Sequence, residues 1–111
     1  MLCLPLAVAC GSDDGGDDKG GALTAPVVEM VMPMAPAGLH VTWKNTTSDC
    51  DAVLGERKTA SVEYAEVFSV PGSVDNKHDG TATDKVEYTY RVRCKRGAEY
   101  SAYSNEMSGT P

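Results

Sequence analysis

The residues in this chain best able to do chemistry are four cysteines and two histidines. Thiolates act as nucleophiles and metal ligands, and paired thiols form disulfides. The chain has no Cys-x-x-Cys pair, no His-Glu-x-x-His run and no Gly-x-Ser-x-Gly elbow, so the spacing supports neither a zinc centre nor a nucleophilic active site. We therefore predict no catalytic residue, no metal and no cofactor, and expect that the protein is not an enzyme. The six residues are Cys3, Cys10, His40, Cys50, His78 and Cys94.

Length and charge exclude further classes. The chain has 111 residues, with 10 Lys and Arg against 16 Asp and Glu, which gives a formal net charge of −6. This length fits one domain. A nucleic-acid binder carries a basic footprint, so we expect no nucleic-acid partner. No apolar run reaches the roughly 20 residues that a membrane-spanning helix needs.

The first segment has the pattern of an export signal. Residues 1–9 are apolar and end in small residues directly before Cys10, as in exported precursors. The run Leu6-Ala7-Val8-Ala9-Cys10 resembles a bacterial lipobox, in which signal peptidase cuts before a cysteine that then carries lipid. The resemblance implies a lipidated Cys10 that anchors the protein to a membrane. No basic residue precedes the apolar run, so we expect a signal truncated at its start. The alternative is a soluble secreted protein without lipid.

The segment after Cys10 predicts a tether. Residues 11–22 have the sequence GSDDGGDDKGGA, which has too little hydrophobicity and too much charge to fold, and glycine makes such segments flexible. Its aspartates lack the ligand spacing of an EF-hand loop, and so does the segment from Asp75 to Val86. We expect residues 10–24 to be a lipidated cysteine with a flexible acidic linker, and Asp75 to Val86 to be a solvated loop.

Residues 25–111 alternate between apolar and polar side chains. Leu39, Val41 and Trp43 share one face of a strand, and no window carries a helical stripe. Short alternating runs between turn signals predict seven strands in an all-β antiparallel sandwich. The clearest runs are Pro26–Met32, Leu39–Lys44, Val53–Lys58, Tyr64–Val70, Tyr88–Cys94 and Tyr103–Thr110.

Several of these runs resemble strands of the fibronectin type III family. Gly38 to Trp43 resembles its second strand, Tyr88 to Cys94 its sixth and Tyr103 to Thr110 its last, with Glu56-Arg57-Lys58 similar to the end of the third. The resemblance covers residues 25–111 and implies an immunoglobulin-like sandwich.

The same resemblance assigns roles to single residues. It implies that Trp43, Tyr88, Tyr90 and Val92 lie in the core. It makes Tyr88 the tyrosine-corner residue, whose hydroxyl bonds to the backbone upstream. Gly55 stands where the family usually has a large aliphatic residue.

The resemblance also implies that two of the cysteines lie close together. Cys50 precedes the third strand and Cys94 ends the sixth, and these strands are antiparallel neighbours in this family. Opposed residues there have Cα atoms about 4.5–5.5 Å apart, which a disulfide accepts. Export places the protein in an oxidising compartment, so we predict a Cys50–Cys94 disulfide. The alternative, a reactive or zinc-binding thiol pair, lacks nearby imidazoles, because we expect His40 to point outward and His78 to lie in a loop.

One surface combines basic and aromatic residues. Arg91 and Arg93 should share the outward face of the sixth strand, near Arg57 on the third, with Arg96 and Tyr100 in the loop that follows. Such a surface suits an acidic polysaccharide or an anionic protein. The alternative is a solvated strand whose charges pair with nearby glutamates. The candidate binding surface comprises Arg57, Arg91, Arg93, Arg96 and Tyr100.

Together these features predict an exported, non-catalytic cell-envelope lipoprotein. It would display one fibronectin type III domain for binding, adhesion or spacing, in the periplasm or at the cell surface of a bacterium. Its partners would be the membrane, through the lipid, and a protein or polysaccharide ligand. The alternative is an accessory, carbohydrate-binding or spacer fragment of a secreted polysaccharide-degrading enzyme.

Overall fold

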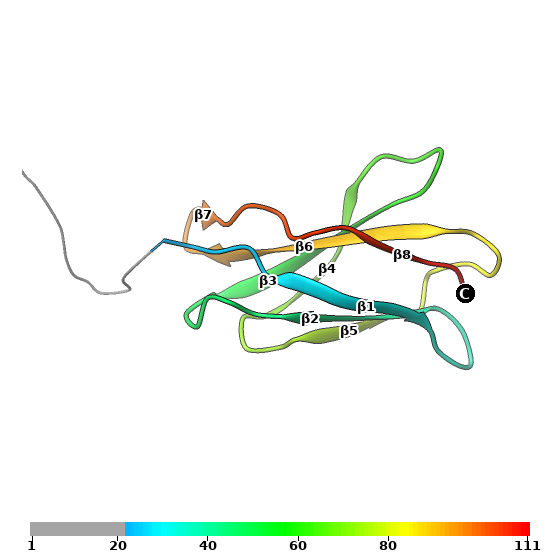
Figure 1. Ribbon diagram of the computed structural model, residues 1–111, viewed down its shortest axis with the longest axis horizontal. Helices are drawn as coiled ribbons and strands as arrows, with labels where there is room; N and C mark the ends of the chain where they lie inside the picture. The colour runs from blue at the N-terminus through cyan, green and yellow to red at the C-terminus, as the bar shows by residue number, and fades with distance from the viewer. Residues whose placement is uncertain (1–21) are drawn as a thin grey trace, which may run out of the picture.

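The computed structural model describes residues 22–111, so the predicted signal, Cys3, Cys10 and most of the predicted linker lie outside the described residues. The described part consists of eight β-strands and contains no helix that could cross a membrane (Figure 1). The strands are β1 Val27–Pro33, β2 Leu39–Lys44, β3 Ala52–Lys58, β4 Ala65–Pro71, β5 Asn76–Asp79, β6 Tyr88–Arg96, β7 Glu99–Tyr100 and β8 Met107–Gly109.

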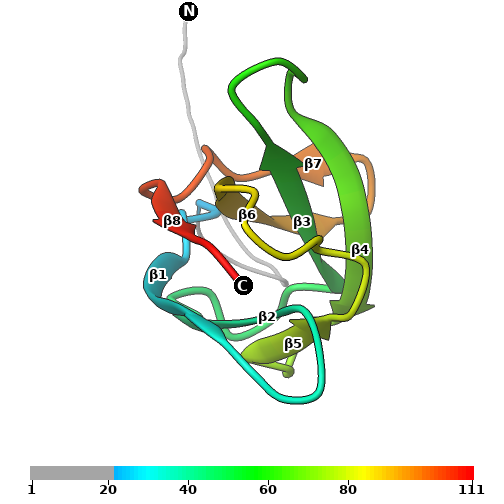
Figure 2. The same cartoon turned by 90° about the vertical axis from the view of Figure 1, so that its right-hand side faces the viewer.

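The strands form two antiparallel sheets that pack face to face (Figure 2). One sheet has the order β1-β2-β5. The other has the order β4-β3-β6-β7, and β8 also pairs with β6. All pairings are antiparallel, so the predicted all-β sandwich is confirmed.

The strand count differs from the expected seven because the last strand is split into β7 and β8. Between them, the N–H groups of Ser101 and Ser104 still donate to β6, but serine hydroxyls replace the main-chain carbonyls as acceptors. The Val92 N–H donates to Ser104 Oγ and the Cys94 N–H donates to Ser101 Oγ, both at 2.9 Å. Because the hydroxyls stand where main-chain carbonyls of a regular ladder would lie, the strand is interrupted there.

The strand β5 lies within the segment from Asp75 to Val86, which we expected to be a solvated loop. That expectation is wrong for residues 76–79. Its sequence, Asn-Lys-His-Asp, has no apolar alternation, so the pattern gave no sign of a strand. His78 consequently lies in a strand, directly opposite His40 of β2. Asp79 is only 7% exposed.

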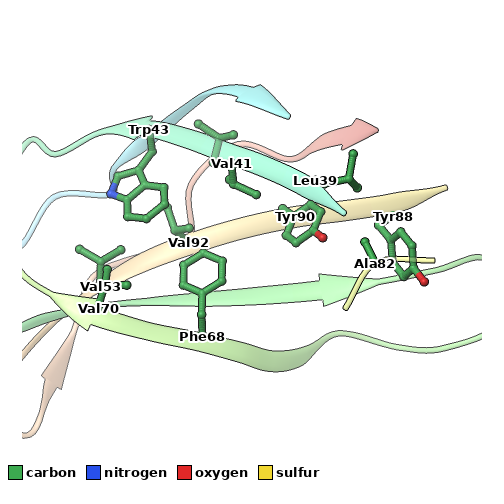
Figure 3. Close-up of a cluster of buried hydrophobic side chains, with 11 residues drawn as sticks. Leu39, Val41, Trp43, Val53, Phe68, Val70, Ala82, Tyr88, Tyr90 and Val92 are labelled. Carbon is green, nitrogen blue, oxygen red and sulfur yellow. The ribbon is translucent and has the colours of Figure 1, made fainter. Parts of the chain in front are cut away.

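The core lies between the two sheets and contains the residues assigned to it by the resemblance (Figure 3). Trp43 stacks on Phe68, with ring centroids 5.6 Å apart. The Phe68 ring also covers Gly55, where an added Cβ would lie 2.1 Å from the Phe68 Cζ. The ring therefore fills the space of the large aliphatic residue usual at this position. The buried members of this cluster are Val28, Leu39, Val41, Trp43, Val53, Phe68, Val70, Ala82, Tyr88, Tyr90 and Val92.

Two side chains, one from the core and one at a sheet edge, bond to main-chain groups elsewhere in the fold. The Tyr88 hydroxyl accepts a hydrogen bond of 2.9 Å from the Thr83 N–H, five residues upstream, as a tyrosine corner does. At the edge of β1, the Val28 N–H donates to Asn105 Oδ1 at 2.8 Å, and Asn105 Nδ2 donates to the Val28 carbonyl at 3.0 Å. Asn105 thus bonds to Val28 as a neighbouring strand would.

Candidate ligand-binding face

The two cysteines of the described part form a disulfide. Cys50 and Cys94 are joined with their Cα atoms 5.6 Å apart, which confirms the predicted pairing. Cys94 is fully buried, so the bond has a structural role. Across residues 22–111, no group of three or more His, Cys, Asp or Glu side chains is arranged to hold a metal ion.

The alternation of β6 places Arg91 and Arg93 on the outer face of the five-stranded sheet. Tyr88, Tyr90, Val92 and Cys94 are buried, and the residues between them are half-buried. Tyr100 of β7 pairs with Lys95 of β6 and is 47% exposed. Three residues of the predicted binding surface, Arg91, Arg93 and Tyr100, therefore come from one region of the sheet.

Arg57 lies on the other face. Register pairs it with Tyr90 of β6, not with Arg91, and its guanidinium makes an ion pair of 2.7 Å with Asp79. The Tyr90 hydroxyl donates to the same carboxylate at 2.6 Å, and Thr81 donates its N–H and hydroxyl to the second oxygen. Arg57 thus belongs to a polar network that joins β3 and β6 to β5 of the opposite sheet.

The network shifts the pKa of the groups within it. Burial alone raises the pKa of Asp79, but hydrogen bonds from Thr81, Tyr90 and Arg57 outweigh burial and hold it below its ordinary value. Burial, followed by the hydrogen bond to Asp79, raises the pKa of Tyr90. Asp79 is therefore an ionised carboxylate at neutral pH and each of its oxygens accepts hydrogen bonds.

Arg96 is also placed differently from the prediction. The strand β6 extends to Arg96, two residues beyond Cys94, so alternation turns this side chain to the buried side. It is 9% exposed and its Nη1 lies 3.0 Å from both carboxylate oxygens of Asp49. The expectation of an exposed loop residue is wrong, because the strand is longer than the pattern predicted.

Two tyrosines that the sequence did not single out complete the outer face. The Arg91 guanidinium lies 3.8 Å from the ring centroid of Tyr64 and 3.6 Å from that of Tyr103. The Arg93 guanidinium lies 4.7 Å from Tyr103 and 4.0 Å from Tyr100. The side chains form an alternating row, Tyr64, Arg91, Tyr103, Arg93 and Tyr100, called here the Tyr–Arg face. Only two features of the sequence indicated this row, a tyrosine directly before β4 and another before β8.

The two arginines of the Tyr–Arg face differ in charge balance. Arg91 pairs with Glu56, whose Oε1 lies 2.7 Å from Arg91 Nη2 and whose Oε2 accepts a hydrogen bond from the Tyr103 hydroxyl at 3.0 Å. Burial lowers the pKa of Arg91, but the hydrogen bond and charge of Glu56 outweigh it and raise the pKa overall. Arg93 has no ion pair with any described carboxylate.

This arrangement can hold an anionic, ring-containing ligand. A guanidinium donates two parallel hydrogen bonds to a carboxylate or sulfate, and tyrosine rings offer apolar faces with a polar end. Arg93 supplies the uncompensated cation, while Tyr100 is the most exposed ring in the row. Tyr100 also borders an open pocket of about 290 Å³ whose walls include Leu23, Glu99 and Ala102.

Comparison with known proteins identifies the fold. No family model and no curated protein sequence matches the chain. A β-1,2-glucanase from Parabacteroides distasonis matches with a TM-score of 0.69 and 18% identity, over 80% of this chain and 13% of the glucanase. An Fn3-like protein from Clostridium thermocellum matches with a TM-score of 0.67 and 16% identity, over 81% of this chain and 94% of that protein.

A fibronectin type III domain of human collagen XX gives the same result. Its TM-score is 0.67 at 13% identity, over 87% of this chain and all of that domain. Similarity at these identities reports on the backbone arrangement. Residues 22–111 have the fibronectin type III fold.

Proposed function

We propose that this chain is a non-catalytic cell-envelope lipoprotein whose single fibronectin type III domain binds an acidic polysaccharide. The observation that carries the binding proposal is the Tyr–Arg face, where Arg93 is stacked between two tyrosines and has no described carboxylate partner. Anchoring rests on the sequence before the domain, in which Cys10 follows an apolar run. The acidic linker would hold the domain away from the membrane.

The anchor is tested by mass spectrometry of the protein purified from bacterial membranes. The expected product begins at Cys10 and carries a diacylglycerol on the thiol. A Cys10→Ala variant is the control and should not acquire lipid. An unmodified Cys10, or a product that is not cleaved before it, contradicts the anchor and leaves the soluble secreted alternative.

Ligand binding is tested with polygalacturonate, a polymer of uronic acids. Arg93→Gln should weaken its binding by about tenfold or more, because a hydrogen bond to a charged group contributes roughly 1.5–3 kcal/mol. Tyr100→Ala should weaken it through loss of ring stacking, and added salt should weaken it in the wild type. Lys77→Gln removes a cation from β5 in the other sheet and is the matched control. A wild-type domain that does not bind polygalacturonate contradicts the proposal.

A second candidate is an accessory domain of a polysaccharide-degrading enzyme. The glucanase from Parabacteroides distasonis favours it, because this fold makes up only 13% of that chain. The discriminating ligand is neutral β-1,2-glucan. Binding that requires Tyr100, is unaffected by Arg93→Gln and is insensitive to salt supports this candidate and contradicts the acidic-ligand proposal.

A further inference from the structure

The outer face of the β1-β2-β5 sheet carries thioethers where polar side chains are expected. Met30, Met32 and Met34 alternate along β1 and the residue after it, and are 43%, 44% and 43% exposed. A sheet with one solvated face normally presents polar residues to water. Among the described methionines, only Met107 lies elsewhere, packed against the core.

Two imidazoles lie beside this row of thioethers. The register of the sheet places Met32 opposite His40, and His40 opposite His78. Opposed side chains on neighbouring antiparallel strands point to the same face, with Cβ atoms about 4.5–5.5 Å apart. Met32, His40 and His78 therefore form one line across three strands, and Met30 flanks it along β1.

The two rings retain uncommitted nitrogens. Neither His40 Nδ1 nor His78 Nδ1 has a hydrogen-bond partner, although both atoms are shielded from solvent. The ring centroids are 6.2 Å apart. A metal–nitrogen bond of about 2.0–2.1 Å places a ring centre roughly 3.2 Å from the ion, so two imidazoles that share one ion have centres up to roughly 6.4 Å apart. The observed pair lies within that limit.

The donor types select the metal. Thioether sulfur is a soft ligand that favours Cu⁺, imidazole also suits copper, and Ca²⁺ and Mg²⁺ require oxygen donors. Zn²⁺ would use the two imidazoles but prefers further thiolate, imidazole or carboxylate ligands. Among residues 22–111, no third His, Cys, Asp or Glu side chain is placed to share an ion with the two histidines. The methionines are what distinguish this face from a simple histidine pair.

We propose that Met32, His40 and His78 bind one cuprous ion on the outer face of the β1-β2-β5 sheet. The strands hold the three donors in line, with His40 between Met32 and His78, and the ion would take its ligands from all three. Met30 supplies a second thioether on the same strand. This site is on the opposite sheet from the Tyr–Arg face and does not depend on the proposed ligand.

The test measures Cu⁺ binding by competition with bicinchoninate under anaerobic ascorbate, which leaves the disulfide intact. The full chain is used with Cys3→Ala and Cys10→Ala, so that no free thiol competes for copper. We expect one ion per chain, and we expect Ag⁺, a redox-inert analogue, to bind at the same site. His78→Gln and Met32→Leu should each weaken Cu⁺ binding by tenfold or more. Met107→Leu makes the same substitution away from the site and should have no effect.

Methyl NMR of the methionines gives an independent readout. Addition of Ag⁺ should shift the Met32 methyl signal strongly and leave that of Met107 unchanged. Circular dichroism of each variant verifies that it remains folded. Absence of Cu⁺ and Ag⁺ binding, or binding unaffected by both His78→Gln and Met32→Leu, overturns the proposal. Zn²⁺ binding that requires the histidines but not Met32 would also overturn the assignment to copper.

Discussion

The two ends of the sandwich each contain an arginine–aspartate pair, but the pairs differ in burial and in what surrounds them. At one end, Asp49 is 33% exposed and pairs with Arg96 beside the Cys50–Cys94 disulfide. At the other end, Asp79 is 7% exposed and pairs with Arg57. The first end is held by a covalent bond between β6 and the loop that precedes β3. The second end is held by a polar network between the two sheets. We therefore expect the two arginine–aspartate pairs to contribute differently to the free energy of unfolding.

The largest expected effect comes from removal of the disulfide. Cys50→Ala with Cys94→Ala should lower the free energy of unfolding by about 4 kcal/mol, because the bond closes a loop with a sequence separation of 44 residues. Urea denaturation of the variant and of the oxidised wild type measures the difference. A loss below 1 kcal/mol would mean that this end does not depend on its covalent bond.

The next largest effect comes from the buried aspartate. Asp79→Ala removes the carboxylate that accepts from the Arg57 guanidinium and the Tyr90 hydroxyl, and leaves Arg57 only the Thr81 hydroxyl as a neutral acceptor. We expect a loss of about 3 kcal/mol, at the lower end for a broken buried pair because Arg57 is 20% exposed. Urea denaturation under oxidising conditions measures it with the disulfide intact. An unchanged midpoint would show that the disulfide end alone determines stability.

Acid should produce a smaller effect at the same network, because a protonated carboxyl group still makes hydrogen bonds. The pKa of Asp79 is lowered in the folded state, so its contribution is present above the unfolded pKa of about 3.9 and is lost as pH falls through the lower folded value. Stability should therefore decline below about pH 4. Asp79→Asn should show a shallower decline over this range, measured by thermal unfolding at several pH values. Equal slopes would contradict the assignment.

The smallest effect is expected for Asp49→Ala. This carboxylate is partly exposed, and Arg96 keeps Glu99 within 3.5 Å after the substitution. We expect a loss of no more than about 1 kcal/mol, because Asp49 is 33% exposed and the buried Arg96 keeps a second carboxylate partner. Chemical denaturation of Asp49→Ala and Asp79→Ala under the same conditions compares the two losses of stability. Equal losses in the two variants would remove the distinction between the ends.

The sequence predicted those parts of the fold that depend on local alternation. Trp43 and the buried side of β6 follow from a period-two pattern, and family resemblance then placed Cys50 beside Cys94. The strand β5 escaped prediction because its four residues are polar and its place is determined by pairing with β2.

The candidate site was predicted only in part, for a related reason. Arg91 and Arg93 lie on one strand, so alternation alone puts them on the same face. Arg57 lies on another strand, and its face depends on the register that pairs it with Tyr90. The stacking of Tyr64 on Arg91 joins segments far apart in sequence, and no local pattern reports such a contact.

The hydrogen bonds between Asn105 and Val28 also bear on self-association. A bare sheet edge exposes N–H and C=O groups that can add a strand from another molecule, which leads to aggregation. In β1, the amide of Asn105 occupies both groups of Val28, a bulge interrupts the register between Val28 and Met30, and Pro33 ends the strand. An incoming chain therefore meets, at β1, an edge on which few consecutive backbone groups are free, which disfavours strand addition there when many copies are crowded together.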